Sequence, residues 1–401
     1  MSASLWELLD FVARWVHVVA GIMWVGNSTL FTWLDRKLEP PAGPSFTKAA
    51  LGSAWLLHSG GFYHVEKTLL TGEPLPRPLH WFKWQAYTTW LSGALLLLVV
   101  YYLSDRAALV DPGSGALTQR QAASLGIGCV AAGWALWELT QRTIAPRAET
   151  LSRLVWLAGF VAITWALTHW LTGRAAFLHV GALIGSIMAG NVFFTIVPSQ
   201  RVLVASVEHG QTLGSAASAR AKRVSLFNNF FTFPVIALMI SNHFPALYGS
   251  RWNLGVLWII LAGGIAVRHA LNRRYVTRSW VPGLGLALGT TVAALLAVLL
   301  VPSHRAAAPT VAAGPVTFAE ARHVIDRRCA ACHSAAPSDL TFGAAPGGVT
   351  FDTPEQIASH ASRILERAVT TRTMPLGNKT HITDGERAVL ARWIAAGAPT
   401  R

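Results

Sequence analysis

Eight apolar runs constrain this chain more than any other feature of its sequence. Each has about 18 residues or more, enough for a helix to cross the hydrocarbon layer of a bilayer. They cover residues 11–34, 84–104, 121–141, 152–171, 175–197, 225–242, 253–271 and 281–301. A helix bonds its own backbone polar groups inside that layer. The sequence therefore predicts an all-α bundle of eight transmembrane helices over residues 1–301.

The composition agrees with a lipid bilayer as the main environment of the chain. Charged residues make up only 13% of the 401 residues, against roughly 25% in soluble domains. A net charge of +14 would point to nucleic acid in a soluble protein. Here the Lys and Arg residues gather in loops between apolar runs, which indicates membrane topology, so no nucleic-acid partner is expected.

The basic residues lie mostly in alternate loops. One set of loops contains Arg36, Lys37, Lys48, Lys67, Arg77, Lys83, Arg142, Arg147, Arg153, Arg201, Arg220, Lys222, Arg223, Arg268, Arg273, Arg274 and Arg278. The opposite set contains Arg106, Arg120, Arg174 and Arg251. Because positive loops remain in the cytoplasm, we expect a multi-pass protein of the bacterial cytoplasmic membrane. Its N-terminus and the segment after residue 302 should face the periplasm.

The last apolar run is followed by a change in composition. Residues 302–315 are rich in Ala and Pro, which is typical of a linker, and residues 316–401 then form a small outer domain. Its segment Cys329-Ala-Ala-Cys332-His333 has the spacing that attaches a haem covalently, with His333 as an iron ligand. Half of a zinc site is the alternative, but a structural zinc ion needs about four ligands and no other cysteine is nearby.

The second axial ligand of this haem c should come from later in the domain. Met374, followed by Pro375, is the only methionine after the linker, and a thioether opposite a histidine raises the potential. His360 and His381 are alternatives, although His381 lies in an expected surface turn. Thr383 and Glu386 have capping-box spacing and precede an apolar helical face, formed by Val389, Leu390, Trp393 and Ile394. Residues 316–401 resemble a class I cytochrome c, which accepts one electron at a time.

Ionisable residues within the apolar runs suggest a second cofactor. Such residues are costly in a bilayer and are usually functional. Arg14 and His17 lie on one face of the first run, and His179 lies in the fifth at a comparable depth. His17 and His179 are candidate ligands of a non-covalent haem b, with Arg14 pairing a propionate. Alternatively, both histidines only bond between helices, and His169 is a further candidate ligand.

The long cytoplasmic loop, residues 35–83, contains a second group of reactive residues. Ser59-Gly60-Gly61 predicts a tight hairpin-like turn, and His58, His64 and Lys67 gather around it. They are candidate catalytic residues, since they combine bases with a cation beside a flexible turn. The alternative is a loop lying on the bilayer interface, where Trp, Tyr and Lys anchor helices.

Three segments carry a family resemblance: "RWVHVVAGIMWVG" (residues 14–26), "HSGGFYHVEK" (58–67) and "HWFKWQAYTTWLSG" (80–93). With the eight spans and the C-terminal haem motif, they resemble the integral-membrane urate oxidase (urate hydroxylase) family. The resemblance implies purine catabolism by oxidation of urate with water to 5-hydroxyisourate. Electrons would pass to the protein's own haem c rather than directly to oxygen, and then to an acceptor such as a soluble cytochrome or a terminal oxidase.

Residue types compatible with this chemistry occur in the cytoplasmic loop. His58 or His64 can act as a base, Lys67 or Lys83 can stabilise negative charge, and an aromatic ring, Tyr63 or Trp81, can stack on a planar anion. Electrons from such a site must cross the bilayer to reach haem c, and haem b would carry them. Two other functions stay open: a quinol–cytochrome c oxidoreductase of cytochrome b type, and a non-catalytic membrane-anchored electron carrier.

Overall fold

The computed structural model describes residues 3–40, 50–68, 70, 75–103, 109–110, 117–210, 215–250, 252–278, 280–300, 316–339 and 345–400. The expected linker, residues 302–315, lies outside this described part, as do Lys48, Arg106 and Arg251 of the topology pattern. The described residues are mostly helical, as the sequence predicts.

Among the described residues, seven helical segments are long and apolar enough to cross a membrane. They are Leu8–Lys37 of α1 (Ala3–Lys37), α3 (Gln119–Thr143), α4 (Glu149–Trp170), Gly173–Glu208, Ala219–Ser241 of α7 (Ser215–Ser241), α9 (Asn253–Arg273) and α10 (Trp280–Leu299). A short helix, α8 (Pro245–Tyr248), precedes α9. The seven segments confirm that this is a helical bundle compatible with a multi-pass membrane protein.

The second expected run, residues 84–104, is the one without a matching apolar segment. It forms α2 (Trp84–Leu97) and the π-helical turn η1 (Leu98–Tyr102). This helix packs along α1, but it is not among the seven apolar segments. Gln85, Thr88 and Thr89 make its first turns more polar than a typical span. Its crossing of the membrane stays a prediction.

The fifth run continues further than the sequence predicts. Helix α5 (Gly173–Asn191) passes through the π-helical turn η4 (Val192–Ile196) into α6 (Val197–Glu208). The predicted run ends at residue 197, directly before Pro198, which lacks an N–H group. The helix continues because the wider turn η4 directly before the proline accommodates it. The interpretation of Arg201 as a loop residue is therefore wrong, since Arg201 lies within α6.

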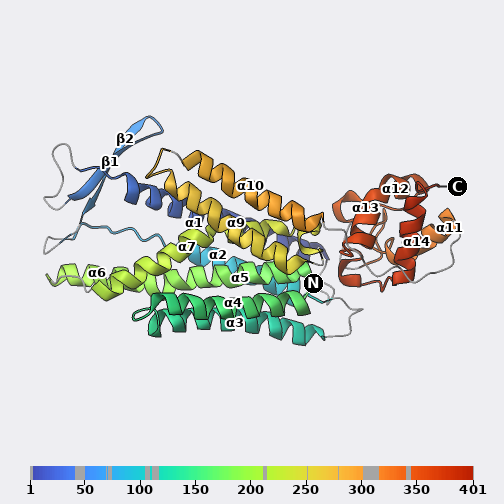
Figure 1. Cartoon of the computed structure of the whole chain (residues 1–401), viewed down its shortest axis with the longest axis horizontal. Coiled ribbons are helices and arrows are strands. Elements are labelled where there is room, and N and C mark those ends of the chain that lie inside the picture. Colours follow the sequence, from blue (N-terminus) through green and yellow to red (C-terminus); the bar gives the residue numbers. More distant parts are fainter. Residues whose placement is uncertain are drawn as a thin grey trace.

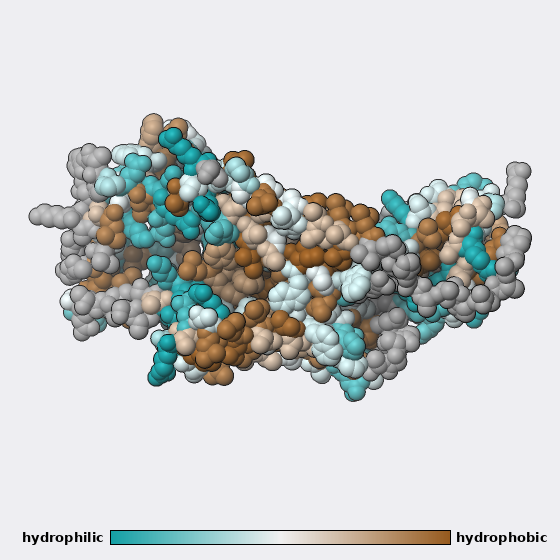
Figure 2. Space-filling view, viewed as in Figure 1, coloured by the Kyte–Doolittle hydropathy of each residue, from teal (hydrophilic) through white to brown (hydrophobic). Residues whose placement is uncertain are grey.

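Helix α5 forms the centre of the bundle. Most of its side chains are buried, and one apolar cluster joins it to α3, α4, α7 and α9. The outer surface is apolar as well: Figure 2 shows brown side chains over the middle of the bundle, and Phe11, Ile22 and Leu286 are each more than half exposed. Exposing such surface to water costs about 25 cal/mol per Å², so this band is expected to face lipid.

One β-hairpin departs from the predicted all-α fold. Strands β1 (Ala50–His58) and β2 (Gly61–Thr68) pair antiparallel, around the turn that the sequence predicts. Ser59 and Gly60 both have positive φ there, which Gly adopts without strain. The sequence did not predict the strands themselves. The hairpin lies at the opposite end of the bundle from the N-terminus (Figure 1).

The residues after 316 pack around an apolar cluster of their own, and they are called here the C-terminal unit (residues 316–400). Its helices are α11 (Phe318–Arg328), α12 (Pro354–Ser359), α13 (Ala361–Ile364), η6 (Leu365–Thr370) and α14 (Asp384–Ala395), with 3₁₀ turns η5 (Pro346–Gly348) and η7 (Leu376–Asn378). The predicted capping box of Thr383 and Glu386 is present at the start of α14. Leu390 and Trp393 are fully buried, which confirms the predicted apolar face.

The N-terminus and the C-terminal unit lie at the same end of the bundle (Figure 1). Gly249, directly after α8, approaches the C-terminal unit so closely that an added Cβ would lie 2.9 Å from Thr371 Cβ and 2.9 Å from Thr373 Cγ2. The segment next to Met374 therefore touches the bundle. Which end faces the periplasm stays a prediction from the basic loops.

Candidate functional site

The first candidate site is the turn that follows α11. The backbone N–H of Cys329 donates to Ile325 O at 2.8 Å, and those of Cys332 and His333 donate to Cys329 O at 3.1 and 2.9 Å. These bonds form a tight turn that contains both cysteines and the histidine. Both cysteines are free and partly buried, and Cys329 packs against the apolar cluster of the C-terminal unit.

The side chain of His333 is held in one orientation. Its Nδ1 lies 2.9 Å from Val349 O, so the N–H at Nδ1 donates to that carbonyl. Nε2 has no hydrogen-bond partner within the described ranges. This is the arrangement of a metal-binding histidine, in which the bond at one nitrogen orients the other. Burial lowers the pKa of His333 below its ordinary value, which favours the neutral form that binds iron.

Both thiols are protonated at neutral pH, which suits attachment to a cofactor better than reaction as free thiolates. Burial raises the pKa of Cys329 to about 12. Burial, followed by repulsion from Asp339, raises that of Cys332 to about 11. Reactive thiols have the opposite shift, so a role as redox nucleophiles is disfavoured. Two neutral thiols and an oriented imidazole beside an apolar cluster fit a c-type haem, whose thioether bonds remove both sulfhydryl groups.

Met374 lies in a loop that is fixed at both sides. Its N–H donates to Arg367 O at 2.9 Å, and its carbonyl accepts 2.9 Å from Arg387 Nη1. Arg387 is only 5% exposed, and it also bonds Ala368 O and Asn378 Oδ1. The backbone around this thioether is therefore held by a buried guanidinium on α14.

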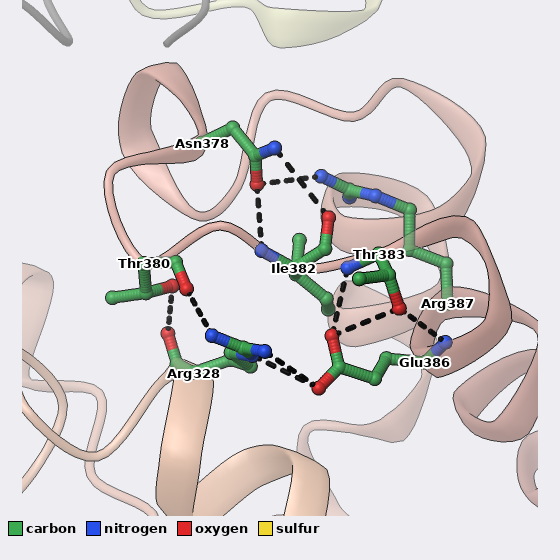
Figure 3. A network of polar contacts seen from close by, with 7 residues as sticks. All are labelled: Arg328, Asn378, Thr380, Ile382, Thr383, Glu386 and Arg387. Atoms are coloured by element: carbon green, nitrogen blue, oxygen red, sulfur yellow. Dashed lines mark hydrogen bonds and ion pairs between the residues drawn. The ribbon is translucent and has the colours of Figure 1, made fainter. Parts of the chain in front are cut away.

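A polar network joins the Met374 loop to the cysteine turn (Figure 3). Arg328, the residue before Cys329, forms an ion pair of 2.9 Å with Glu386. Thr380 Oγ1 donates to Arg328 O at 2.8 Å, and Asn378 Oδ1 accepts from the N–H of Ile382 at 3.0 Å. Both halves of the candidate haem site are thus tied to α14.

The alternative ligands differ in their surroundings. His381 is exposed in a turn with a φ of 55°, which confirms the prediction of a surface residue. The ring of His360 lies 6.0 Å from that of Phe351, and Phe351 lies 5.3 Å from His333. Among the described residues, no three side chains of the His, Cys, Asp and Glu types gather as a metal-binding group.

The two histidines of the membrane bundle contact different parts of the α2–η1 helix. His17 Nδ1 lies 2.9 Å from Thr89 O, and Nε2 has no hydrogen-bond partner in the described part of the chain. The fully buried His179 bonds Ala175 O through Nδ1 at 2.7 Å and Tyr102 Oη through Nε2 at 2.9 Å. The His17 ring also lies beside Gly93, where an added Cβ would be 2.9 Å from its Cε1, and Gly93 and Tyr102 are separated by about 13 Å along a helix. The two imidazoles thus contact different turns of α2–η1, and Nε2 of His179 is already bonded to Tyr102.

Arg14 lies on α1 one turn from His17, but its guanidinium already has a partner. Arg14 Nε forms an ion pair of 2.9 Å with Asp10. Its expected role beside a haem propionate stays a prediction.

The hairpin does not bring its three candidate catalytic residues together. Side chains alternate between the faces of a strand, so His64 and Lys67 on β2 point to opposite faces. His64 stacks on Trp55 with ring centroids 4.4 Å apart. His58 shares the face of Lys67, but it pairs with Gly61, about 20 Å along the strand from Lys67. The catalytic roles of His58, His64 and Lys67 stay predictions.

The other residues considered for a substrate site are also apart from one another. Tyr63 is 54% exposed on the hairpin, Lys83 Nζ lies 5.4 Å from the ring centroid of Trp84, and Trp81 packs beside Ala86. A groove of about 300 Å³ opens between α1 and α2, and Trp15, Val19, Met23 and Trp84 contribute to its largely apolar lining. Such a lining suits a lipid chain better than an anion.

Sequence reasoning missed a polar cluster inside the bundle, here called the arginine–asparagine cluster (Arg36, Asn229, Phe233, Arg268 and Asn272). Arg268 was counted as a loop residue, but it lies within α9 and is only 4% exposed, so that interpretation is wrong. Asn229 on α7 and Asn272 on α9 are also buried. Their signal in the sequence was a polar residue inside each of two runs, Asn229 in 225–242 and Arg268 in 253–271, whereas Asn272 lies one residue beyond the second run.

Hydrogen bonds connect this cluster across three helices. Asn229 Oδ1 accepts from Asn272 Nδ2 at 2.7 Å and from Arg268 Nε at 3.3 Å. Asn229 Nδ2 donates to Thr32 Oγ1 on α1 at 3.1 Å. Arg36 Nη1 donates to Asn272 O at 2.6 Å, and Arg268 Cζ lies 5.2 Å from the ring centroid of Phe233. The arrangement concentrates positive charge and amide groups at the hairpin end of the bundle.

Comparison with known proteins yields one match. The model of the family described as urate oxidase N-terminal matches residues 3–313, which include the whole helical bundle and exclude the described part of the C-terminal unit. No curated protein and no solved structure matches the chain.

Proposed function

The chain belongs to the urate oxidase N-terminal family, and from this premise we propose that it is a membrane-bound, cytochrome c-linked urate oxidase. Family membership itself indicates a urate-related oxidoreductase. The finer proposal is that electrons from urate pass to a haem c in the C-terminal unit rather than directly to oxygen. It is carried by one observation: the Cys329–His333 turn, with its oriented imidazole, follows a bundle of this family in the same chain.

The proposed reaction is balanced without oxygen as a reactant. The urate monoanion and one water give 5-hydroxyisourate, one proton and two electrons. A C–O bond forms between water and C5 of the purine, and a base must accept the proton that water loses. His58 and His64 are the proposed bases and Lys67 is the proposed cation. The two electrons must leave one at a time if a single haem accepts them.

A bound haem c would supply the one-electron acceptor. In this proposal Cys329 and Cys332 would hold the group covalently, and His333 Nε2 and the Met374 thioether would bind its iron. The apolar cluster that includes Phe351, Ile364 and Leu390 would exclude water from it. The contact of Thr371 and Thr373 with Gly249 supports electron entry through the face that contacts the bundle.

Transfer across the bilayer calls for an intermediate carrier. We assign this role to a non-covalent haem b, for which His17 is the better placed donor because its Nε2 has no hydrogen-bond partner among the described residues. His179 would first have to leave Tyr102. Arg14 remains the proposed propionate partner. Beyond haem c, a soluble cytochrome or a terminal oxidase would accept the electrons on the periplasmic face of a bacterial cytoplasmic membrane.

Removal of the attachment cysteines tests the electron route. Membranes with the wild-type chain should consume urate, reduce added soluble cytochrome c and release no hydrogen peroxide. The double variant Cys329→Ala, Cys332→Ala should lose urate-dependent cytochrome reduction, and Cys129→Ala should not. Cytochrome reduction at the wild-type rate by the double variant would refute haem c as the carrier.

A further inference from the structure

Arg268 is a buried cation without an anionic partner. None of the ion pairs among the described residues includes Arg36, Arg268 or Arg274. The acidic neighbour of Arg36, Asp35, pairs with Lys67 of the hairpin. A charge removed from water costs several kcal/mol unless it is compensated, and ionisable residues kept inside spans usually serve function. The cluster therefore has the charge of an anion site.

The hydrogen-bonding capacity of Arg268 is largely unused. Nε donates to Asn229, but neither Nη atom has a hydrogen-bond partner in the described part of the chain. A guanidinium carries five N–H groups, so most of them are available to a ligand. Asn229 bonds the guanidinium directly, and Asn229 is in turn held by Asn272 and Thr32. The donors are thus preorganised on three packed helices.

The shape of this arrangement favours a planar ligand with adjacent acceptors. The guanidinium fork matches two acceptors side by side, and the ring of Phe233 already lies against it, so a flat ligand can extend the same stack. A purine anion presents carbonyl and ring-nitrogen acceptors on one edge and N–H groups on another.

We propose that the arginine–asparagine cluster is the urate-binding site, with Arg268 contacting the anion and Asn229 and Asn272 positioning Arg268. This proposal rests on the proposed function. Lys67 of the hairpin pairs with Asp35 near the end of α1, the helix that also contributes Arg36 to the cluster. The hairpin lies at the end of the bundle opposite the C-terminal unit (Figure 1), and the basic loops assign that end to the cytoplasm.

Direct binding of urate tests the site apart from turnover. We would measure equilibrium dialysis of radiolabelled urate against the detergent-solubilised full chain, with its haem kept reduced by dithionite so that no urate is consumed. Arg268→Lys keeps the charge and removes the fork, and should weaken binding by about tenfold or more. Arg273→Lys, an exposed position on the same helix, is the matched control and should bind as the wild type does.

A second substitution guards against a folding defect. If Arg268→Lys loses the haem c spectrum, Phe233→Leu would be measured in its place, since a leucine keeps most of the apolar volume but removes the stacking face. Weaker urate binding with an unchanged haem spectrum supports the site. Wild-type affinity in the variant, while the wild type oxidises urate, overturns the site and leaves the proposed function intact.

Two other results would have different meanings. A wild-type protein that neither binds nor oxidises urate would refute the proposed function itself, together with the site. Phospholipid that copurifies with the wild type and is lost from Arg268→Lys, at unchanged urate affinity, would assign the cluster to a lipid phosphate and overturn the inference.

Discussion

The guanidinium of Arg387 donates a hydrogen bond of 2.9 Å to the carbonyl oxygen of Met374, so a buried cation on α14 holds the backbone of the proposed thioether ligand. Arg387→Lys leaves one donor group where the fork reaches Ala368, Met374 and Asn378. We expect a loss of about 1–3 kcal/mol in the free energy of unfolding of the C-terminal unit, and a looser Met374 loop.

The loss of the Arg387 contact should also change the spectrum and the midpoint potential of the haem. The charge-transfer band of Met-ligated ferric haem should weaken in Arg387→Lys and the midpoint potential should fall, because a thioether raises it. Arg363→Lys, at an exposed position of α13, is the control and should retain both properties. A full charge-transfer band and an unchanged potential in Arg387→Lys would show that this contact does not position the ligand.

Glu386 predicts an acid-sensitive C-terminal unit. Burial raises its pKa, but hydrogen bonds from the backbone and hydroxyl of Thr383 and the ion pair with Arg328 outweigh this, so the net pKa lies below the ordinary value of 4.5. A lowered carboxyl pKa in the folded state stabilises the fold above about pH 4.5, and this contribution is lost as pH falls below it. Circular dichroism of the haem bands should show a steeper acid transition in the wild type than in Glu386→Gln. Equal slopes would contradict the assignment.

The close contact at Gly249 leads to a prediction about electron transfer between the bundle and the C-terminal unit. In Gly249→Ala the new Cβ would lie 2.8 Å from Pro245 O as well as 2.9 Å from Thr371 and Thr373, so the backbone or the C-terminal unit has to shift. We expect urate-driven reduction of haem c to slow several-fold, while reduction by ascorbate and the haem spectrum remain unchanged. Gly255→Ala, where nothing lies within 4 Å of the added Cβ, is the control, and equal rates in the two variants would remove this contact from the electron route.

The separation of His17 and His179 predicts that they do not act as a ligand pair. His17→Ala should remove a non-covalent haem signal from purified protein and leave the covalent haem. His179→Ala should retain the signal, because its Nε2 is taken by Tyr102. The exposed His169, stacked on Trp165, provides the control variant His169→Ala. A haem b signal that survives in His17→Ala would remove His17 as a ligand.

The sequence predicts those structural features that depend on residues close together along the chain. Run lengths predict the spans, Gly60 predicts the hairpin turn, and the Thr383–Glu386 spacing predicts the start of α14. The assignment of Cys329, Cys332 and His333 to a haem rests on their spacing and stays a prediction. The strands around Gly60 were missed because their aromatic residues are equally typical of an interfacial loop.

What the sequence could not show depends on contacts between distant segments. Arg268 lies near the end of its run, where basic residues also mark a loop, and only the packing of α9 on α7 reveals that it is buried. The role of Arg387 depends on the chain folding back to Met374. The depth shared by His17 and His179 in the sequence did not reveal that they face different turns of the α2–η1 helix.

The proposed electron route is best tested by anaerobic addition of urate to the oxidised, detergent-solubilised protein. We expect the haem c bands to become reduced in proportion to the 5-hydroxyisourate formed, with two electrons released per urate. Oxygen should not be needed. No reduction by urate, with prompt reduction by a quinol, would refute urate oxidation and assign the chain to quinol–cytochrome c oxidoreduction instead.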